Sequence, residues 1–500
     1  MKIAIVASEA APFAKTGGLA DVAGSLPKAL FRLGHEPIVI MPLYRTVRQS
    51  RVALTDAGKV SVPVGRQVIE SRLWRGEIPG TDASVYFLEQ GKYYDRDGLY
   101  GYSGDPSDPE SSGRTGDFLD NCERFVFLSR GAVEAVRAIG FEADVFHIHD
   151  WPTALIAPYL RLLYRSDPRL GKAATLLTIH NIAHQGIFWH WDMELLGIDW
   201  SHFHVGEFEF WGKINLLKAG IVFADVVNTV SPTYADEIQT PAHGQGLDGV
   251  LRERHNVLHG VVNGIDDAIW NPAGDAHITA AYGPEDLRGK ELCKRALQRQ
   301  CDLPQRKVPL IGIVSRFAEQ KGLDLVAQAL PDLFDREGMQ CIILGEGDGS
   351  IRILLESVAK QFPDRLRVFV RRDERLAHRI IAGADMTLVA SRFEPCGLTQ
   401  LYGLKYGAVP IVRRTGGLAD TVCDCTPETL AAGRATGFVF DAPTPEAVSD
   451  SVRRAIELYH DPKSWQRLTQ IGMRQDWSWE ASARKYLELY SEAKILKVRA

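Results

Sequence analysis

The chain is poor in cysteine, lacks long apolar runs and carries no large excess of charge of one sign. Its seven cysteines are scattered over 500 residues and form no C-x-x-C pair. This pattern excludes a disulfide-stapled scaffold and a structural zinc site, and it is typical of proteins in a reducing cytoplasm. No stretch has the length of apolar residues that a membrane-spanning helix needs. We therefore expect a cytoplasmic protein without a membrane partner.

The charge balance and the length set two further limits. The formal net charge is −5, from 58 lysines and arginines against 63 aspartates and glutamates. Proteins that bind nucleic acid usually carry a basic surface, so we expect no nucleic-acid partner. A hydrophobic content of 45% and a charged content of 24% are those of a folded globular chain. Its length is too great for one ordinary core, which predicts at least two domains.

Short apolar runs alternate with helical patterns in both halves of the chain. KIAIVAS, EPIVIMP, DVFHIHD and ATLLTIHN mark strands of the first half, and VPLIGIVSRF, MQCIILGEGD and DMTLVAS mark strands of the second. Such alternation predicts parallel sheets covered by helices. We predict an α/β protein of two Rossmann-like, doubly wound domains, 1–260 and 261–479, that face a central cleft. Residues 480–500 carry the spacing of a final amphipathic helix.

The hexapeptide TGGLAD occurs twice, at 16–21 and at 415–420, each time after a basic residue and before a helical pattern. Paired glycines allow a tight turn and a close approach of the backbone to a ligand. The N-terminus of the following helix offers unpaired N–H groups and a partial positive charge. The repeat therefore predicts two phosphate-binding corners, one in each domain, although a glycine pair can also mark an ordinary turn.

Charged residues follow two strands of the predicted second sheet. Arg316 and Lys321 lie in SRFAEQKGLD, across a strand-to-helix turn, so both could neutralise a diphosphate leaving group. Glu394 follows the strand DMTLVAS, and its carboxylate could bind sugar hydroxyls or stabilise a developing cation. The alternative for each is a solvated surface charge.

Histidines at strand ends suggest a second chemistry. His147, His149 and Asp150 end one predicted strand, and His180 follows another. Imidazole and carboxylate groups can ligate a metal ion, so a metal-dependent hydrolase built on these four residues is an alternative hypothesis. Strand alternation turns both histidines to one face and Asp150 to the other. That arrangement favours one catalytic histidine and a packing role for the rest.

A series of motifs runs in order over nearly the whole chain. They are KTGGLADV, HIHDW, TVSPTYADEI, GVVNGID, QKGLDL, LGEGD, SRFEPCGLTQLYGLKYG and RTGGLADTV. With them the sequence resembles the bacterial glycogen (starch) synthases, which are retaining glucosyltransferases of the two-domain GT-B fold. The resemblance implies transfer of glucose from ADP-glucose to the non-reducing end of an α-1,4-glucan such as glycogen, with no metal and no other cofactor. It also implies that the helix in 480–500 packs back on the N-terminal, acceptor-side domain.

Carried over residue by residue, the resemblance implies two sets of site residues. The catalytic set is Asp150, His180, Arg316, Lys321 and Glu394. The donor-binding set is Lys15, Gly17, Gly18, Asp21, Tyr100, Asn263, Arg372, Cys396, Gly397, Leu398, Thr415, Gly416 and Gly417. Cys396 lies in the donor loop without acting as a nucleophile.

One position departs from the family pattern. Before LAHRI the family usually has an aromatic residue that stacks on the base, whereas this chain reads VRRDERLAHRI, with Arg372 at that position. A guanidinium plane can also stack on a base. UDP-glucose therefore remains an alternative donor to ADP-glucose.

Overall fold

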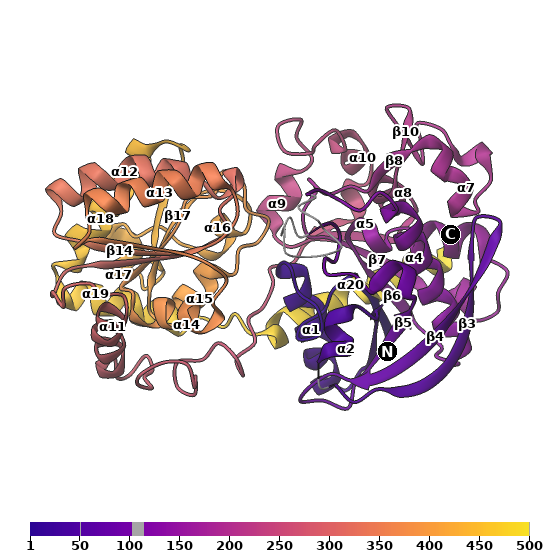
Figure 1. Cartoon of the computed structure of the whole chain (residues 1–500), viewed down its shortest axis with the longest axis horizontal. Coiled ribbons are helices and arrows are strands. Elements are labelled where there is room, and N and C mark those ends of the chain that lie inside the picture. Colours follow the sequence, from indigo (N-terminus) through magenta and orange to yellow (C-terminus); the bar gives the residue numbers. More distant parts are fainter. Residues whose placement is uncertain (51, 103–114, 500) are drawn as a thin grey trace. The chain divides into compact units, whose positions relative to one another are not determined.

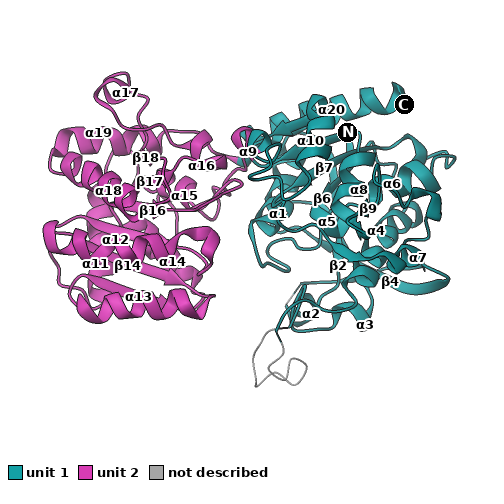
Figure 2. Ribbon diagram, turned by 90° about the horizontal axis from the view of Figure 1, so that it is seen from above, with its two compact units in different colours: residues 1–230, 235–261, 479–500 teal, residues 231–234, 262–478 magenta. Residues whose placement is uncertain are grey.

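A computed structural model describes residues 1–50, 52–102 and 115–499 of the chain (Figure 1). The chain forms two compact units, each with its own parallel sheet (Figure 2). Unit 1 comprises Met1–Val230, Ala235–Val261 and Trp479–Ala500, and unit 2 comprises Ser231–Tyr234 and Val262–Ser478.

The main sheet of unit 1 is a long parallel sheet with an antiparallel hairpin at one edge. Its strands are β1 (Lys2–Val6), β2 (Glu36–Pro42), β3 (Thr55–Val64), β4 (Gln67–Glu77), β5 (Ser84–Glu89), β6 (Val145–His149), β7 (Ala174–Ile179), β11 (Val226–Thr229) and β12 (Leu258–Gly260). They lie in the order β12-β11-β7-β6-β1-β2-β5-β4-β3, and β4 and β3 are the antiparallel pair.

Helices cover this sheet, and a small antiparallel sheet is attached to the unit. The helices are α1 (Gly18–Arg32), α2 (Arg45–Gln49), α3 (Gly91–Tyr94), α4 (Asn121–Ala138), α5 (Asp150–Thr153), α6 (Ile156–Pro158), α7 (Met193–Leu196), α8 (Leu216–Phe223), α9 (Pro232–Glu237, which begins in unit 2), α10 (Asp248–Glu253) and α20 (Trp479–Arg499). The small sheet has the order β8-β10-β9 and consists of β8 (Ile187–Trp189), β9 (Glu209–Phe210) and β10 (Lys213–Asn215).

Unit 2 is built on a sheet whose strands are all parallel. The strands are β13 (Leu310–Val314), β14 (Gln340–Gly345), β15 (Leu366–Val370), β16 (Met386–Val389), β17 (Val409–Arg413) and β18 (Phe438–Phe440). Their order is β15-β14-β13-β16-β17-β18. The helices are α11 (Arg288–Gln300), α12 (Leu323–Arg336), α13 (Gly349–Gln361), α14 (Glu374–Gly383), α15 (Thr399–Lys405), α16 (Gly416–Thr421), α17 (Pro427–Ala431), α18 (Pro445–Tyr459) and α19 (Pro462–Met473).

The central strands of unit 2 are buried on both faces, which explains why they are largely apolar. Ile311 and Ile313 of β13 pack into the core on one face of the sheet, whereas Leu310 packs into the core on the other. On β14, Ile343 and Leu344 divide in the same way. Side chains alternate along a strand, so a sheet with helices on both faces needs apolar residues at every position. The predicted α/β class with doubly wound parallel sheets is confirmed.

The strand order of each sheet reverses at one point, which marks where ligands bind. In unit 1 the reversal lies between β1 and β6, and in unit 2 it lies between β13 and β16. In open α/β sheets ligands occupy the crevice outside the carboxyl ends of the strands at such a switch point. The residues that follow these four strands are therefore the first candidates for a functional site.

The last helix of the chain completes unit 1. Tyr486 and Tyr490 of α20 are fully buried, and the Tyr490 hydroxyl lies 2.8 Å from Nδ1 of His147. Lys494 forms an ion pair of 2.6 Å with Asp144, just before β6. The C-terminal residues are thus part of the structure that holds the β6 strand.

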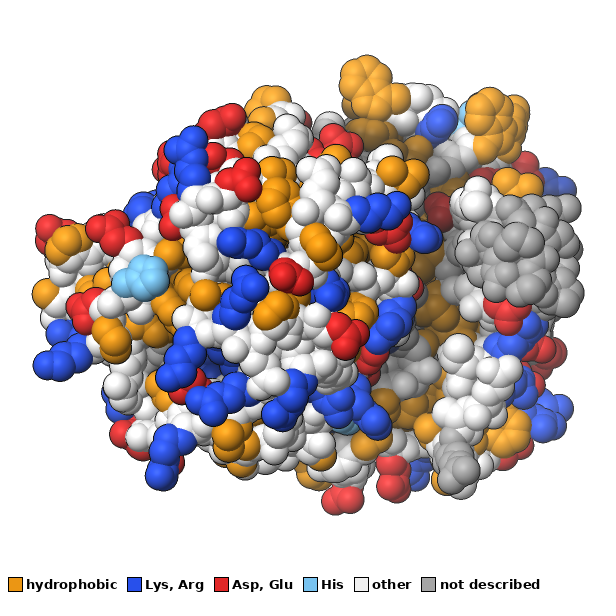
Figure 3. Space-filling model, turned by 60° about the vertical axis from the view of Figure 1, so that its left-hand side comes forward, with side chains coloured by type: hydrophobic (Ala, Val, Ile, Leu, Met, Phe, Trp, Pro, Cys, Tyr) orange, Lys and Arg blue, Asp and Glu red, His pale blue; other side chains and the backbone are white. Residues whose placement is uncertain are grey.

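The surface carries charges of both signs. On the face drawn in Figure 3, lysine and arginine side chains are interspersed with aspartate and glutamate side chains. Within the described ranges, none of the helices combines the length and apolarity that spanning a bilayer requires.

Candidate functional site

Asp150 follows β6 directly, at the switch point of unit 1, and its backbone is strained. Its φ is 53°, in the left-handed region that non-glycine residues rarely adopt. The carboxyl group is 8% exposed and accepts the backbone N–H groups of His180, at 2.7 Å, and Asn181. Burial outweighs these two hydrogen bonds and raises the pKa of Asp150 to about 7. A carboxyl group with such a pKa can exchange a proton near neutral pH.

The three predicted histidines have different surroundings. His147 is fully buried, and its two ring nitrogens lie 2.6 and 2.8 Å from the hydroxyls of Thr178 and Tyr490. Nδ1 of His149 lies 3.0 Å from Nε2 of His180. Burial lowers the pKa of His180 to about 3, so its ring is neutral at physiological pH. His147 packs under α20, whereas the half-buried His180 stands at the end of β7.

The alternative hypothesis, a metal-dependent hydrolase, requires a set of metal ligands, and the part of the chain that the structure describes contains no such set. Among those residues, no group of three or more His, Cys, Asp or Glu side chains is arranged to hold a metal ion. One carboxyl oxygen of Asp150 accepts the His180 backbone N–H instead.

Glu9 is central to the first hexapeptide, although the sequence did not single it out. It follows β1 at the switch point and is only 4% exposed. Its carboxylate accepts the backbone N–H groups of Thr16 and Gly17, the Thr16 hydroxyl at 2.9 Å and the Tyr100 hydroxyl at 3.0 Å. Burial raises the pKa of Glu9 despite these contacts. The Thr16 and Gly17 N–H groups of the predicted anion-binding corner therefore bind a carboxylate of the chain itself.

The rest of the first hexapeptide is accessible. Lys15 and Asp21 form an ion pair of 2.6 Å between partly exposed side chains. Gly17 and Gly18 are exposed, and a Cβ added to Gly17 would meet no atom within 4 Å. Glu9 also acts electrostatically on Asp150, where its charge contributes to the raised pKa. The structure thus brings these predicted donor residues close to a predicted catalytic residue.

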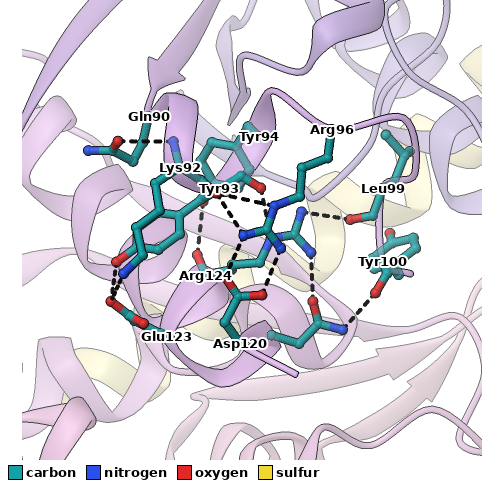
Figure 4. A network of polar contacts seen from close by, with 11 residues as sticks. Gln90, Lys92, Tyr93, Tyr94, Arg96, Leu99, Tyr100, Asp120, Glu123 and Arg124 are labelled. Atoms are coloured by element: carbon teal, nitrogen blue, oxygen red, sulfur yellow. Dashed lines mark hydrogen bonds and ion pairs between the residues drawn. The ribbon is translucent and has the colours of Figure 1, made fainter. Parts of the chain in front are cut away.

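A buried arginine holds the loop that carries Tyr100 (Figure 4). Arg124 of α4 is fully buried, and its guanidinium donates to the carbonyls of Tyr93 and Leu99, each at 2.9 Å. Asn121 donates to the Tyr100 carbonyl at 2.8 Å. An arginine is rarely buried unless its donors are satisfied, and here backbone carbonyls satisfy them. We did not predict from the sequence that Arg124 holds this loop, because Arg124 lies within an ordinary helical pattern.

At the switch point of unit 2, a lysine and a glutamate form a buried ion pair. Lys321 Nζ lies 2.6 Å from Oε2 of Glu394, and the Ser391 hydroxyl donates to the same oxygen at 2.8 Å. Arg316 follows β13 and is exposed, and its guanidinium forms no ion pair with the residues that the structure describes. Three charged residues predicted for catalysis therefore follow the two strands that flank the switch point.

The second hexapeptide packs against the loop that contains Glu394. Gly416 has a φ of 42°, and a Cβ added there would lie 1.9 Å from the Glu394 carbonyl oxygen. The Gly417 N–H donates to the carbonyls of Glu394 and Pro395, both at 3.1 Å. The protein itself therefore uses this N–H group, and phosphate binding at this copy stays a prediction.

The remaining predicted residues of unit 2 fall into two places. Asn263 is buried, and its backbone N–H is hydrogen-bonded to the sulfur of Cys396. Burial raises the pKa of Cys396 to about 12, which keeps it a thiol near neutral pH. Gly397, with a φ of 74°, and Leu398 continue this loop into α15. Arg372 lies apart from them, exposed in the turn after β15.

Comparisons with known proteins cover nearly the whole chain. A family model described as "Starch synthase catalytic domain" matches residues 2–253, and one described as "Glycosyl transferases group 1" matches residues 295–473. The chain is 46% identical to a glycogen synthase of Syntrophotalea carbinolica over 99% of both chains. It is 45% identical to glycogen synthase 1 of Geobacter metallireducens over 99% of this chain and 96% of that protein.

A solved structure agrees with these matches. The catalytic domain of starch synthase IV from Arabidopsis thaliana, bound to ADP and acarbose, superimposes with a TM-score of 0.89. It is 33% identical and covers 99% of both chains. Together with the two doubly wound units, this similarity confirms the predicted GT-B architecture.

Proposed function

Because the chain belongs to the glycogen and starch synthase family of glycosyltransferases, we propose that it transfers glucose from ADP-glucose to the non-reducing end of an α-1,4-glucan. The observation that carries the proposal is the Lys321–Glu394 pair at the switch point of unit 2, with Arg316 on the adjacent strand end. The ADP donor is supported by the plant starch synthase, whose structure holds ADP and acarbose.

Two cations are assigned to the leaving group. When the bond between C1 of glucose and the phosphate oxygen breaks, negative charge grows on the diphosphate. Arg316 can bind phosphate oxygens with its planar fork, and Lys321 can approach them as a point charge. Charge neutralisation of this kind acts most strongly in the transition state, where the charge develops.

The carboxyl and imidazole groups are assigned to the sugar. Glu394 accepts hydrogen bonds in the structure and can accept them from glucose hydroxyls. Its negative charge also favours the positive charge that develops at C1. His180 is neutral, because burial lowers its pKa to about 3, and a neutral imidazole can donate a hydrogen bond to a hydroxyl at one nitrogen.

Retention follows from attack on the same face of the sugar. The acceptor hydroxyl forms a bond to C1 on the side from which the diphosphate leaves, and its proton passes to the leaving phosphate oxygen. No covalent glucosyl-enzyme is proposed. Retaining glycosidases that form one use two carboxyl groups about 5–5.5 Å apart, and we assign no such pair here.

A donor comparison tests the proposal. Incorporation of glucose into glycogen is measured with ADP-glucose and with UDP-glucose at equal concentration, before and after treatment with a chelator. We expect faster transfer from ADP-glucose and no loss after chelation. A clear preference for UDP-glucose would overturn the donor assignment, and activity that depends on added Mg²⁺ would overturn the role of Arg316 and Lys321. Absence of transfer from both donors would overturn the proposed function.

A further inference from the structure

Three histidines of unit 1 lie side by side on one face of the main sheet. His147 and His149 belong to β6, which pairs in parallel with β7 so that His149 lies opposite Thr178. Side chains alternate along a strand, and His180 follows Thr178 by two positions, so these two side chains share a face. The ring centroids of His147 and His149 are 4.2 Å apart, and those of His149 and His180 are 5.2 Å apart. The rings therefore form a row that ends at the half-buried His180.

All three rings are neutral near neutral pH. Burial lowers the pKa of His147 and His149 well below the ordinary value, and it lowers the pKa of His180 to about 3. A neutral imidazole has one nitrogen that donates a hydrogen bond and one that accepts. The partners of a ring decide which nitrogen holds the proton, so the tautomers can be assigned from the hydrogen bonds.

Two hydroxyl groups fix the tautomer of His147. The Thr178 hydroxyl donates its only proton to Oδ1 of Asn228 at 2.5 Å, so it accepts from Nε2 of His147 at 2.6 Å. The amide of Asn228 is oriented by its own Nδ2, which donates to a backbone carbonyl at 3.2 Å. The Tyr490 hydroxyl then donates to Nδ1 of His147 at 2.8 Å. His147 therefore holds its proton at Nε2, and neither of its nitrogens is left for another ring.

His149 and His180 share one proton between them, because Nδ1 of His149 lies 3.0 Å from Nε2 of His180. If His180 donated this proton, His149 would carry its own proton at Nε2. That nitrogen is buried, and it has no hydrogen-bond partner among the residues that the structure describes. A buried N–H group without an acceptor is costly, and it is rarer than a buried acceptor without a donor. The favoured arrangement is the opposite one, in which His149 donates from Nδ1 and its Nε2 carries no proton.

This arrangement decides which nitrogen of His180 is a donor. With Nε2 accepting from His149, the proton of His180 is at Nδ1. The backbone N–H of His180 donates to the Asp150 carboxyl group at 2.7 Å, which fixes the place of the residue after β7. The position and the tautomer of His180 are thus both set before any ligand binds.

We propose that His149 is a positioning residue, which holds His180 in the tautomer with the proton at Nδ1, so that this ring donates a hydrogen bond to a hydroxyl of the transferred glucose. This inference rests on the proposed function, in which His180 binds the sugar. An imidazole that is free to change tautomer offers a proton at Nδ1 for only part of the time. A donor that is fixed in advance needs no reorganisation during the reaction.

The tautomer is measured on the full chain without any substrate. NMR spectra of the protein with 15N-labelled histidine separate a protonated ring nitrogen from a bare one, and the signals of His180 are assigned by their loss in His180→Ala. We expect the proton of His180 at Nδ1 in the wild type. This preference should be lost in His149→Phe, which keeps an aromatic ring but cannot donate. A wild-type His180 with its proton at Nε2 would overturn the inference.

Steady-state kinetics with saturating glycogen tests the consequence for the reaction. In His149→Phe we expect kcat to fall about tenfold, with the KM for ADP-glucose within about twofold, because the hydrogen bond to the sugar matters most in the transition state. His149→Asn keeps an N–H donor close to the place of Nδ1 and should recover most of this loss. A packing role predicts the reverse order, because phenylalanine keeps the ring and asparagine does not. That order, or an unchanged kcat in His149→Phe, would overturn the proposal.

A double variant tests whether His149 acts through His180. In the background of His180→Ala, adding His149→Phe should lower kcat by less than about twofold, because the group to be positioned is gone. The matched control is Tyr490→Phe, which removes the hydroxyl that binds the neighbouring ring of His147. It should lower the melting temperature and leave kcat within about twofold. Losses that multiply in the double variant, or a tenfold loss of kcat in the control, would overturn the role of His149.

Failure of this inference can be told apart from failure of the proposed function. The NMR measurement needs no ADP-glucose. The expected tautomer in a protein that transfers no glucose would overturn the proposed function and leave the tautomer assignment. Glucose transfer by a protein whose His180 carries its proton at Nε2 would overturn this inference alone.

Discussion

The two copies of TGGLAD have the same sequence and opposite surroundings. In the copy at 16–21 the first three residues are exposed, and the backbone N–H groups of Thr16 and Gly17 bind the carboxylate of Glu9. In the copy at 415–420 the first four residues are buried, and Gly417 donates to backbone carbonyls of the loop around Glu394. Both copies begin a helix, so the local sequence decides the turn, and the surroundings decide its use.

The acidic residues at the ends of the two copies differ in the same way. Asp21 pairs with Lys15 at 2.6 Å near the surface. Asp420 accepts the Ser231 hydroxyl, the Thr233 hydroxyl at 2.7 Å and the Thr233 N–H at 3.1 Å, all at the start of α9. The copy at 16–21 therefore forms a polar, accessible turn, whereas the copy at 415–420 connects two segments of unit 2 through hydrogen bonds. A repeated motif does not imply a repeated role.

The largest expected difference concerns the glycines. In Gly416→Ala the new Cβ would lie 1.9 Å from the Glu394 carbonyl oxygen at a φ of 42°, so the loop must shift. We expect the free energy of unfolding to fall by about 3 kcal/mol or more, because steric overlap and backbone strain add. Gly17→Ala meets no atom and should cost less than about 1 kcal/mol. Calorimetry of both variants checks this, and equal melting temperatures would contradict the comparison.

The next largest difference is expected between Glu9, which binds the first hexapeptide, and Glu394, whose loop packs against the second. Glu394→Gln removes the charge opposite Lys321, and kcat should fall about 100-fold, because both groups act on the charge of the transition state. Glu9→Gln weakens the contacts with Thr16 and Tyr100, and it should act mainly through a KM for ADP-glucose raised about tenfold. Steady-state kinetics with saturating glycogen separates kcat from KM. A larger loss of kcat in Glu9→Gln would reverse the assigned roles.

The fold could be predicted from the sequence where a pattern is local. The runs KIAIVAS, DVFHIHD and DMTLVAS contain β1, β6 and β16, because strands covered on both faces are largely apolar. The hairpin β3–β4 and the small sheet around β10 were not predicted. Their strands are short or half exposed, so they lack the continuous apolar run that marks a strand covered on both faces.

The site could be predicted in part, for a related reason. Residues at strand ends were found because the carboxyl ends of parallel strands meet at one edge, as for Asp150 and Glu394. Glu9 and Arg124 were missed, since their roles depend on hydrogen bonds to Thr16, Tyr93 and other groups that no spacing reveals. We did not predict that the Gly417 N–H group donates to backbone carbonyls of unit 2, because the second hexapeptide has the same sequence as the exposed first one.

Asp150 extends the comparison to pH. Among the residues that the structure describes, Asp150 has no cationic partner of the kind that Lys321 gives Glu394, and burial raises its pKa to about 7 from an ordinary 3.8. The folded state therefore holds a proton that the unfolded chain releases between about pH 4 and pH 7, so stability from this group is full below that window and lost as the pH rises through it.

Asp150→Asn should remove this dependence, and asparagine tolerates the φ of 53°. Relative to the wild type, the variant should gain roughly 1 to 2 kcal/mol between pH 5 and pH 7. Melting temperatures of both proteins at several pH values check the sign. Parallel curves would show that Asp150 does not titrate in this window.

The smallest effect returns to the acids of the hexapeptide. In Asp420→Asn one oxygen remains an acceptor, but the charge that favours the start of α9 is lost, so stability should fall by about 1 kcal/mol. Asp21→Asn breaks a partly exposed ion pair and should cost at most about 0.5 kcal/mol. Raising the salt concentration should shrink the effect of Asp21→Asn, because the pair is exposed, and leave that of Asp420→Asn, whose partners are hydroxyl and N–H groups. Equal salt dependence of the two melting-temperature shifts would mean that both aspartates act through charges that salt screens. The proposed contrast between the exposed ion pair of Asp21 and the hydrogen bonds of Asp420 would then be wrong.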